Sequence, residues 1–202
     1  MTRNSLFLGV VIAMGLAACG SDDIDSDEEA RRAYFGLDQS IEKSITLGFA
    51  GFNSATSANI SPQMATGTDA GTLVITGQVD QGSSDNKGMR LHVGMTGYND
   101  GPLVIDGEPL DVDITYDTSM DVAMQPALDL QLKNIPNGTY TGTLTGVYTM
   151  RGDIEGDATL TLMFSGMIKN DGTGKVIRAP GTTTVTGTAV SGDGTYEVNL
   201  TL

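Results

Sequence analysis

Two rows of acidic residues in this chain have a spacing that could support chemistry. Within each row the carboxylates are an even number of residues apart: Asp153, Glu155 and Asp157 in one, and Asp111, Asp113 and Asp117 in the other. Residues at such spacing share one face of a β-strand, so each row could bind calcium or supply an acid and a base. Alternate charges are also typical of a solvent-facing strand, and EF-hand spacing is absent. Asp153, Glu155 and Asp157 are therefore candidate calcium ligands only.

The chain contains a single His and a single Cys, which restricts the catalytic and metal sites that it could form. One residue of each type cannot form a multi-Cys/His zinc site, a disulfide framework or a c-type haem attachment sequence. His92 alternates with apolar neighbours and is predicted on the solvent face beside Arg90. A catalytic histidine needs a nucleophile and an orienting group, and no pattern identifies either. We therefore predict no catalytic residue and no cofactor, in a chain that is not an enzyme.

The net charge and the length of the chain exclude further classes of function. The chain has 202 residues, with 25 acidic against 11 basic and a formal net charge of −14. Proteins that neutralise a nucleic-acid backbone need clustered Lys and Arg, so a nucleic-acid partner is not expected. The length and an apolar fraction of 39% suit one globular domain of ordinary size.

The N-terminus has the layout of an export signal. Arg3 precedes an apolar run over residues 6–14, which is too short to span a bilayer permanently. The run leads to Leu16-Ala17-Ala18-Cys19, which resembles the lipobox of bacterial lipoproteins. In that family signal peptidase II cuts before the Cys, which then carries the lipid. The resemblance implies a cleaved signal peptide over residues 1–18, acylation of Cys19, for example by palmitate, and attachment to the membrane.

The residues after this Cys bear on location. Enterobacterial members of the family carry Asp directly after the Cys when they stay in the inner membrane, whereas this chain has Gly20, which implies the outer membrane. Residues 19–25 are acidic and almost without apolar side chains, so they predict a solvated tether. We expect a single β-rich domain over residues 26–202, held at the cell envelope by its N-terminal lipid and facing the periplasm or the surface.

One amphipathic helix is predicted at about residues 27–47. Ser26 and Glu29 have capping-box spacing, and acidic residues in the first turn suit the helix dipole. Apolar residues then recur at steps of three and four: Ala30, Tyr34, Leu37, Ile41 and Ile45. Gly36 weakens the helix and could bend it. The polar face is not basic, so the helix is expected to pack on the protein core rather than on a membrane.

From about residue 71 apolar and polar residues alternate, which predicts half-buried antiparallel strands. The clearest runs are residues 89–96, 110–117, 157–164 and 195–202. Turn sequences such as Asn99-Asp100-Gly101 separate them, so short connections and a meander are predicted. Residues 51–70, rich in small polar side chains, are interpreted as the crossover from the helix to the sheet.

Six glycines recur two positions after an apolar residue and are therefore predicted to share its buried face. They are Gly77, Gly97, Gly142, Gly146, Gly166 and Gly187. Glycine weakens a strand unless the sheet bends sharply or another backbone approaches closely. We predict a mainly β fold: one antiparallel, strongly curved sheet or meander barrel of about eight to ten strands, with the helix on its concave face. A β-sandwich and a transmembrane barrel are alternatives, although scarce aromatic residues disfavour the latter.

Two further patterns bear on binding. Met89, Met95 and Met150 fall on the apolar face and could line a ligand site. Arg151-Gly152-Asp153 resembles an integrin-binding tripeptide, although Gly-Asp also suits a tight hairpin loop. The main hypothesis is a lipid-anchored, non-enzymatic envelope module, with a structural role or binding an apolar small molecule or an envelope protein. The alternatives are a carboxylate-based hydrolase of envelope polysaccharide and a calcium-dependent surface adhesin.

Overall fold

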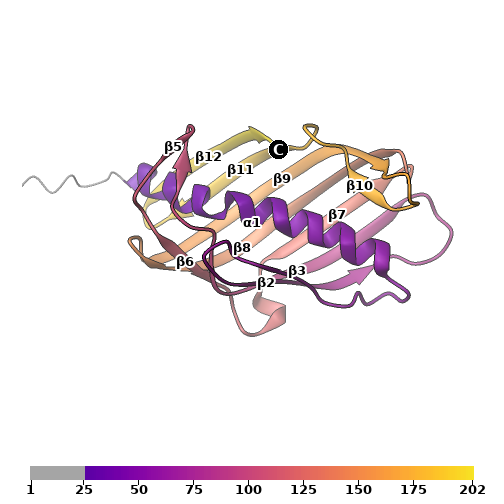
Figure 1. The fold of residues 1–202 in the computed structure, drawn as a ribbon, viewed down its shortest axis with the longest axis horizontal. Coiled ribbons are helices and arrows are strands. Elements are labelled where there is room, and N and C mark those ends of the chain that lie inside the picture. The colour runs from indigo at the N-terminus through magenta and orange to yellow at the C-terminus, as the bar shows by residue number, and fades with distance from the viewer. Residues whose placement is uncertain (1–25) are drawn as a thin grey trace, which may run out of the picture.

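One main antiparallel sheet and one long α-helix make up the described part of the chain, residues 26–202 (Figure 1). This structure is a computed structural model. Every strand pairing in it is antiparallel. The predicted mainly β class, with a single main sheet and one helix, is therefore confirmed. The predicted signal peptide, Cys19 and the tether over residues 19–25 lie outside the described residues.

The main sheet contains ten strands that follow the chain as a meander. Their bounds are β1 (Gln63–Thr66), β2 (Ala70–Val79), β3 (Lys87–Asn99), β6 (Ile114–Asp117), β7 (Ala127–Lys133), β8 (Gly138–Gly152), β9 (Gly156–Asn170), β10 (Val176–Arg178), β11 (Thr184–Ser191) and β12 (Gly194–Thr201). A separate two-stranded sheet and one 3₁₀ turn complete the elements: β4 (Val104–Ile105), β5 (Glu108–Pro109) and η1 (Val122–Met124).

The sheet is open rather than closed into a barrel. Its order is β1-β2-β3-β6-β8-β9-β11-β12, with β7 between β3 and β8 and β10 paired to β9. Within residues 26–202, β1 pairs only with β2 and β12 only with β11. β1 falls inside the segment predicted as a crossover. It was missed because its four residues carry only one large apolar side chain, Met64, which is itself exposed.

Helix α1 (Ser26–Ser54) begins where the capping residues predict and runs past the expected end near residue 47. Its buried stripe continues through Gly48, Phe49 and Gly51, which the three- and four-residue steps ending at Ile45 did not include. The two glycines allow neighbouring side chains to pack closely against the helix. A Cβ at Gly48 would lie 2.8 Å from a methyl group of Leu91, and one at Gly51 would lie 2.7 Å from a methyl group of Ile60. The apolar stripe therefore extends the helix by almost two turns.

Gly36 has a packing role in this helix. The ring of Tyr116, from β6, lies against it, and the Tyr116 hydroxyl donates a 3.0 Å hydrogen bond to the carbonyl oxygen of Ala33. A methyl group at position 36 would overlap that hydroxyl. The cost of glycine in a helix is thus offset by close contact between α1 and the sheet.

The helix contacts strands at both ends of the sheet order. It packs against β11 and β12 on one side and against β1, β2 and β3 on the other, and Figure 1 shows it crossing the face of the sheet. Tyr34, Leu37 and Ile41 fill the space between the helix and the sheet, each with an exposed fraction of 2% or less. Residues 26–202 therefore contain their own hydrophobic core.

Five of the six predicted glycines lie on the core side of their strands, as expected. Each lies two positions from a buried residue of its strand and so shares its face: Gly77, Gly142, Gly146, Gly166 and Gly187. A Cβ at Gly77 or Gly187 would overlap a carbonyl oxygen of the neighbouring strand, so these glycines allow close approach between strand backbones. The prediction was wrong for Gly97. That residue has φ +53° next to an irregularity in the β2–β3 register, and its neighbour Tyr98 is buried instead.

Candidate functional site

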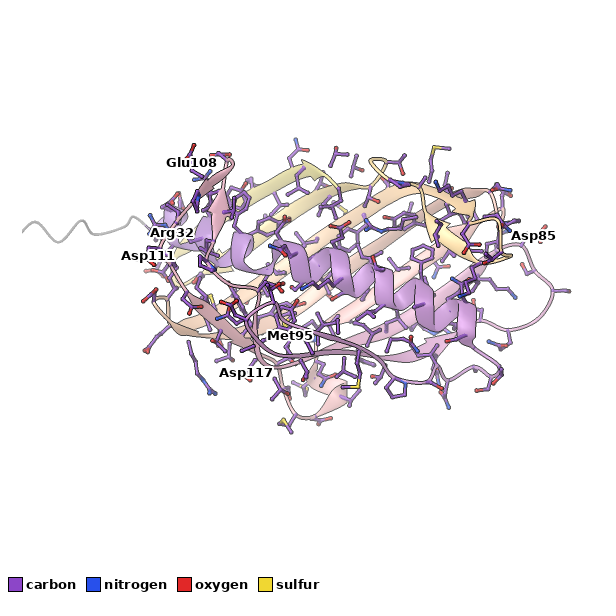
Figure 2. The ribbon with its side chains drawn as sticks, viewed as in Figure 1. Arg32, Asp85, Met95, Glu108, Asp111 and Asp117 are labelled. Carbon is purple, nitrogen blue, oxygen red and sulfur yellow. The ribbon has the colours of Figure 1, made fainter. Side chains whose placement is uncertain are left out.

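The acidic row at Asp153, Glu155 and Asp157 does not form one strand face. β9 begins only at Gly156, so Asp153 and Glu155 lie in the turn before it. Asp153 accepts a 2.8 Å hydrogen bond from the backbone N–H of Asp113, and Asp157 accepts one of 2.9 Å from the Thr149 hydroxyl. In residues 26–202 no three His, Cys, Asp or Glu side chains gather as a metal site. Figure 2 shows other acidic residues, including Asp111 and Asp117, spread around the periphery.

His92 is half-buried, which corrects the prediction of an exposed surface histidine. It lies on β3 opposite Thr76 of β2, on the face away from the core. The segment between β6 and β7 folds toward this face, where the side chain of Gln125 lies against Gly94. The imidazole Nδ1 and the Thr76 hydroxyl are buried without a hydrogen-bond partner. The sequence could not show this cover because it comes from a segment about 30 residues away.

Arg151-Gly152-Asp153 does not form the tight two-residue loop that was predicted. Pairing of β8 with β9 ends at Met150 and Gly156, and Arg151 and Gly152 pair with β6 instead. The Arg151 guanidinium lies 3.6 Å from a carboxylate oxygen of Asp117. This tripeptide therefore belongs to the junction of three strands.

The three methionines that could have lined a ligand site are part of the packed core. Met89, Met95 and Met150 have exposed fractions of 0%, 3% and 1%. They belong to the same buried cluster as Tyr34 and Leu37 of α1. The space inside the sheet is thus occupied by side chains of the helix, and a ligand needs another site.

A partly buried ion pair joins α1 to the end of β3: the Asp100 side chain is 6% exposed and the Lys43 side chain 31%. The Lys43 ammonium bonds both the Asp100 carboxylate and, at 2.9 Å, the Tyr98 hydroxyl. The Tyr98 hydroxyl donates to Asp100 at 2.7 Å, and the N–H of Thr68 donates to the same carboxylate at 3.1 Å. Burial opposes ionisation of Asp100, but hydrogen bonds from Lys43, Tyr98 and Thr68 outweigh it and lower its pKa.

Asp100→Asn is expected to destabilise the domain by about 2 kcal/mol at neutral pH, because charged hydrogen bonds to a buried group are lost. The folded pKa of Asp100 lies below the unfolded value, which is about 4. Its contribution is therefore present above about pH 4 and lost as the pH falls through the folded pKa. Urea unfolding of both proteins at several pH values measures the difference. A difference that is unchanged at low pH would contradict this account, and exposed Asp111→Asn is the control.

A hollow lies in the seam where the sheet stays open, between β1 and β10. It has a volume of about 790 Å³, within the range of small-molecule sites. Its lining comes from the solvent side of α1 and from Gln63 of β1. On the other side it is lined by β10, the loop that follows β10, and Leu202. A second hollow of about 380 Å³ continues along α1 and shares Glu42 and Thr46 with the first. We call the two together the seam groove.

The surface of the larger hollow is mainly apolar, with a few polar groups at defined positions. Apolar side chains come from both walls and the chain end: Phe49, Ala50, Ile177, Pro180 and Leu202. Asn53 fixes β10 to the helix like a strand partner: its amide donates to the carbonyl of Val176 at 2.8 Å and accepts from the N–H of Val176 at 2.9 Å. Together with its pairing to β9, this side chain fixes the position of β10, and so of Ile177 and Arg178.

Arg178 is the polar centre of the larger hollow. Its guanidinium donates to a Glu42 carboxylate oxygen at 2.8 Å and to the Thr183 hydroxyl at 3.3 Å. Thr183 is fully buried and shares a 2.6 Å hydrogen bond with the Tyr140 hydroxyl. Burial raises the pKa of Tyr140, while hydrogen bonding to Thr183 and the charge of Arg178 act in the opposite direction. The arginine is therefore anchored on the core side, and it lines the larger hollow.

No residue that lines this groove was predicted to take part in a site. Arg178 and Glu42 are 136 residues apart, and Asn53 and Val176 are 123 apart. The predicted metal candidates and methionines contribute nothing to it. No spacing in the sequence could have indicated the site, because it exists only where the two ends of the sheet approach the helix.

Comparison of the chain with known proteins assigns no function to the seam groove. Among residues 26–202 no helix has the length and apolar character needed to cross a membrane. No protein-family model, curated protein or solved structure matches the chain.

Proposed function

We propose that this protein is a lipid-anchored, non-enzymatic binding module of the bacterial cell envelope, and that it holds an elongated apolar ligand in the seam groove. The observation that carries the proposal is the groove itself: about 790 Å³, with apolar side chains on two walls. Ligand sites are typically concave and largely apolar, with a few placed polar groups. Arg178 and Asn53 supply such polar groups here.

The architecture we propose for this function is a strongly curved sheet with α1 on its concave face. The helix takes the place that a ligand would occupy in a hollow barrel, since Tyr34 and Leu37 are fully buried there. Binding is then left to the seam, where the solvent side of α1 meets β1 and β10. The hydrolase and adhesin alternatives draw no comparable support from any cluster of side chains in residues 26–202.

Attachment to the membrane belongs to the same proposal. Lipidated Cys19 would anchor the chain in the outer membrane, and a seven-residue tether over residues 19–25 spans at most about 25 Å. The high negative charge of the domain would keep it off anionic head groups. The groove would thus be held near the lipid surface without the domain lying on it.

Ala50→Trp is expected to block the groove. Ala50 is exposed on the solvent side of α1 and lines the larger hollow, so an indole there fills space without entering the core. We expect the affinity for oleyl alcohol, a neutral 18-carbon probe, to fall by at least about tenfold, as measured by calorimetry on residues 20–202. Thr186→Trp, on the outer face of β11, is the matched control. Binding that is equal in both variants would refute the groove as the site.

A further inference from the structure

We propose that the natural ligand of the seam groove is a single-chain amphiphile with an anionic head group, and that Arg178 binds this head in exchange for Glu42. The inference rests on the proposed function, because it names the ligand class of the same groove. Three observations support it: the anchoring of Arg178, the exposure of its present partner, and the balance of charge along the groove.

Arg178 is built into the wall as a fixed cation. Its side chain is only 13% exposed, and its hydrogen bond to buried Thr183 holds one side of the guanidinium. Asn53 holds the backbone of β10 two residues earlier. A guanidinium has five N–H donors and matches carboxylate or phosphate oxygens in pairs. An anionic head could therefore bind here without rearrangement of the wall.

Glu42 is the displaceable partner. Its side chain is 55% exposed, and it reaches Arg178 across the groove from α1 through one contact of 2.8 Å. Ion pairs with an exposed member contribute little to stability, so a ligand carboxylate can replace this one at small cost. Glu42 lines both hollows, and its withdrawal would join them into one longer channel along α1.

The charge along the groove favours an anion. The chain as a whole has 25 acidic and 11 basic residues, yet the larger hollow is lined by two cations, Lys175 and Arg178, against one acid, Glu42. Lys43, beside the smaller hollow, is neutralised by Asp100 and does not compete. A cationic head would face a net positive wall, whereas an anionic head would be attracted to it.

The test compares two probes that differ only in the head group: oleate, below its micelle concentration, and oleyl alcohol. Residues 20–202 are used, since residues 26–202 contain their own core. The unmodified domain is expected to bind oleate about tenfold more tightly than the alcohol at low salt. Arg178→Met should remove this preference and keep alcohol binding. Glu42→Gln should raise oleate affinity severalfold and leave alcohol affinity nearly unchanged.

Controls separate the head-group inference from the proposed function. Arg151→Met removes an exposed cation that is not among the residues lining the groove, and it should leave both affinities unchanged. If Arg178→Met does not fold, the Glu42→Gln result decides, because that position is exposed. Equal binding of oleate and alcohol, with no effect of Glu42→Gln, would overturn the anionic head while leaving an apolar groove. Binding of neither probe would overturn the proposed function as well.

Discussion

Gly187→Val is expected to lose about 3 kcal/mol or more of unfolding free energy, a large share of the stability of an ordinary domain. Gly187 lies inside β11 with φ +141°, a conformation that residues with a side chain rarely adopt. A Cβ there would also overlap the carbonyl oxygen of Thr161 in β9, which is backbone and cannot rotate away. The backbones of β9 and β11 would have to move apart at this point, and the proposed bend of the sheet would be lost with their close approach.

Urea unfolding followed by circular dichroism measures this effect as a shift of the midpoint. The matched control is Thr186→Val, one residue earlier in the same strand, where the side chain is exposed on the outer face. This control should change stability by no more than about 0.5 kcal/mol. Equal midpoints for the two variants would mean that the glycines are not what permits the sheet to bend.

Cys19→Ala is expected to abolish lipid attachment and release the protein from the membrane. The lipobox resemblance makes this thiol the point of acylation, and it is the only Cys in the chain. Each buried methylene of an acyl chain contributes about 0.8 kcal/mol of membrane affinity, so several chains make the anchor effectively stable. Without them nothing in the acidic domain is expected to hold it to an anionic surface.

Incorporation of an alkyne-labelled fatty acid, together with separation of membranes from soluble material, measures both consequences. Ser21→Ala, two residues further along, is the control and should be labelled like the natural protein. A Cys19→Ala protein that still takes up label and sediments with membranes would show that the segment is not a lipoprotein signal. In that case the envelope location proposed above would have to be withdrawn.

Several local elements can be read from the order of residues alone. The helix start, the strands β3, β9 and β12, and the second half of the run at residues 110–117, which is β6, follow from periods of 3.6 and 2 and from capping residues, which act over a few neighbours. The same reasoning placed five glycines on the core side of their strands, since residues two positions apart in a regular strand share one face. It failed at Gly97, where an irregular register breaks that pattern.

The remaining features depend on contacts between distant parts of the chain. The packing of distant strands decides whether the sheet closes, which side chains fill its interior and which segments border the seam. The alternation of residues along one strand carries no information about that packing. Glu42 and Arg178 meet across 136 residues because α1 lies under the open seam and Asn53 holds β10 beside it. Such a contact is stabilised by the packing of the whole domain, so no short stretch of sequence records it.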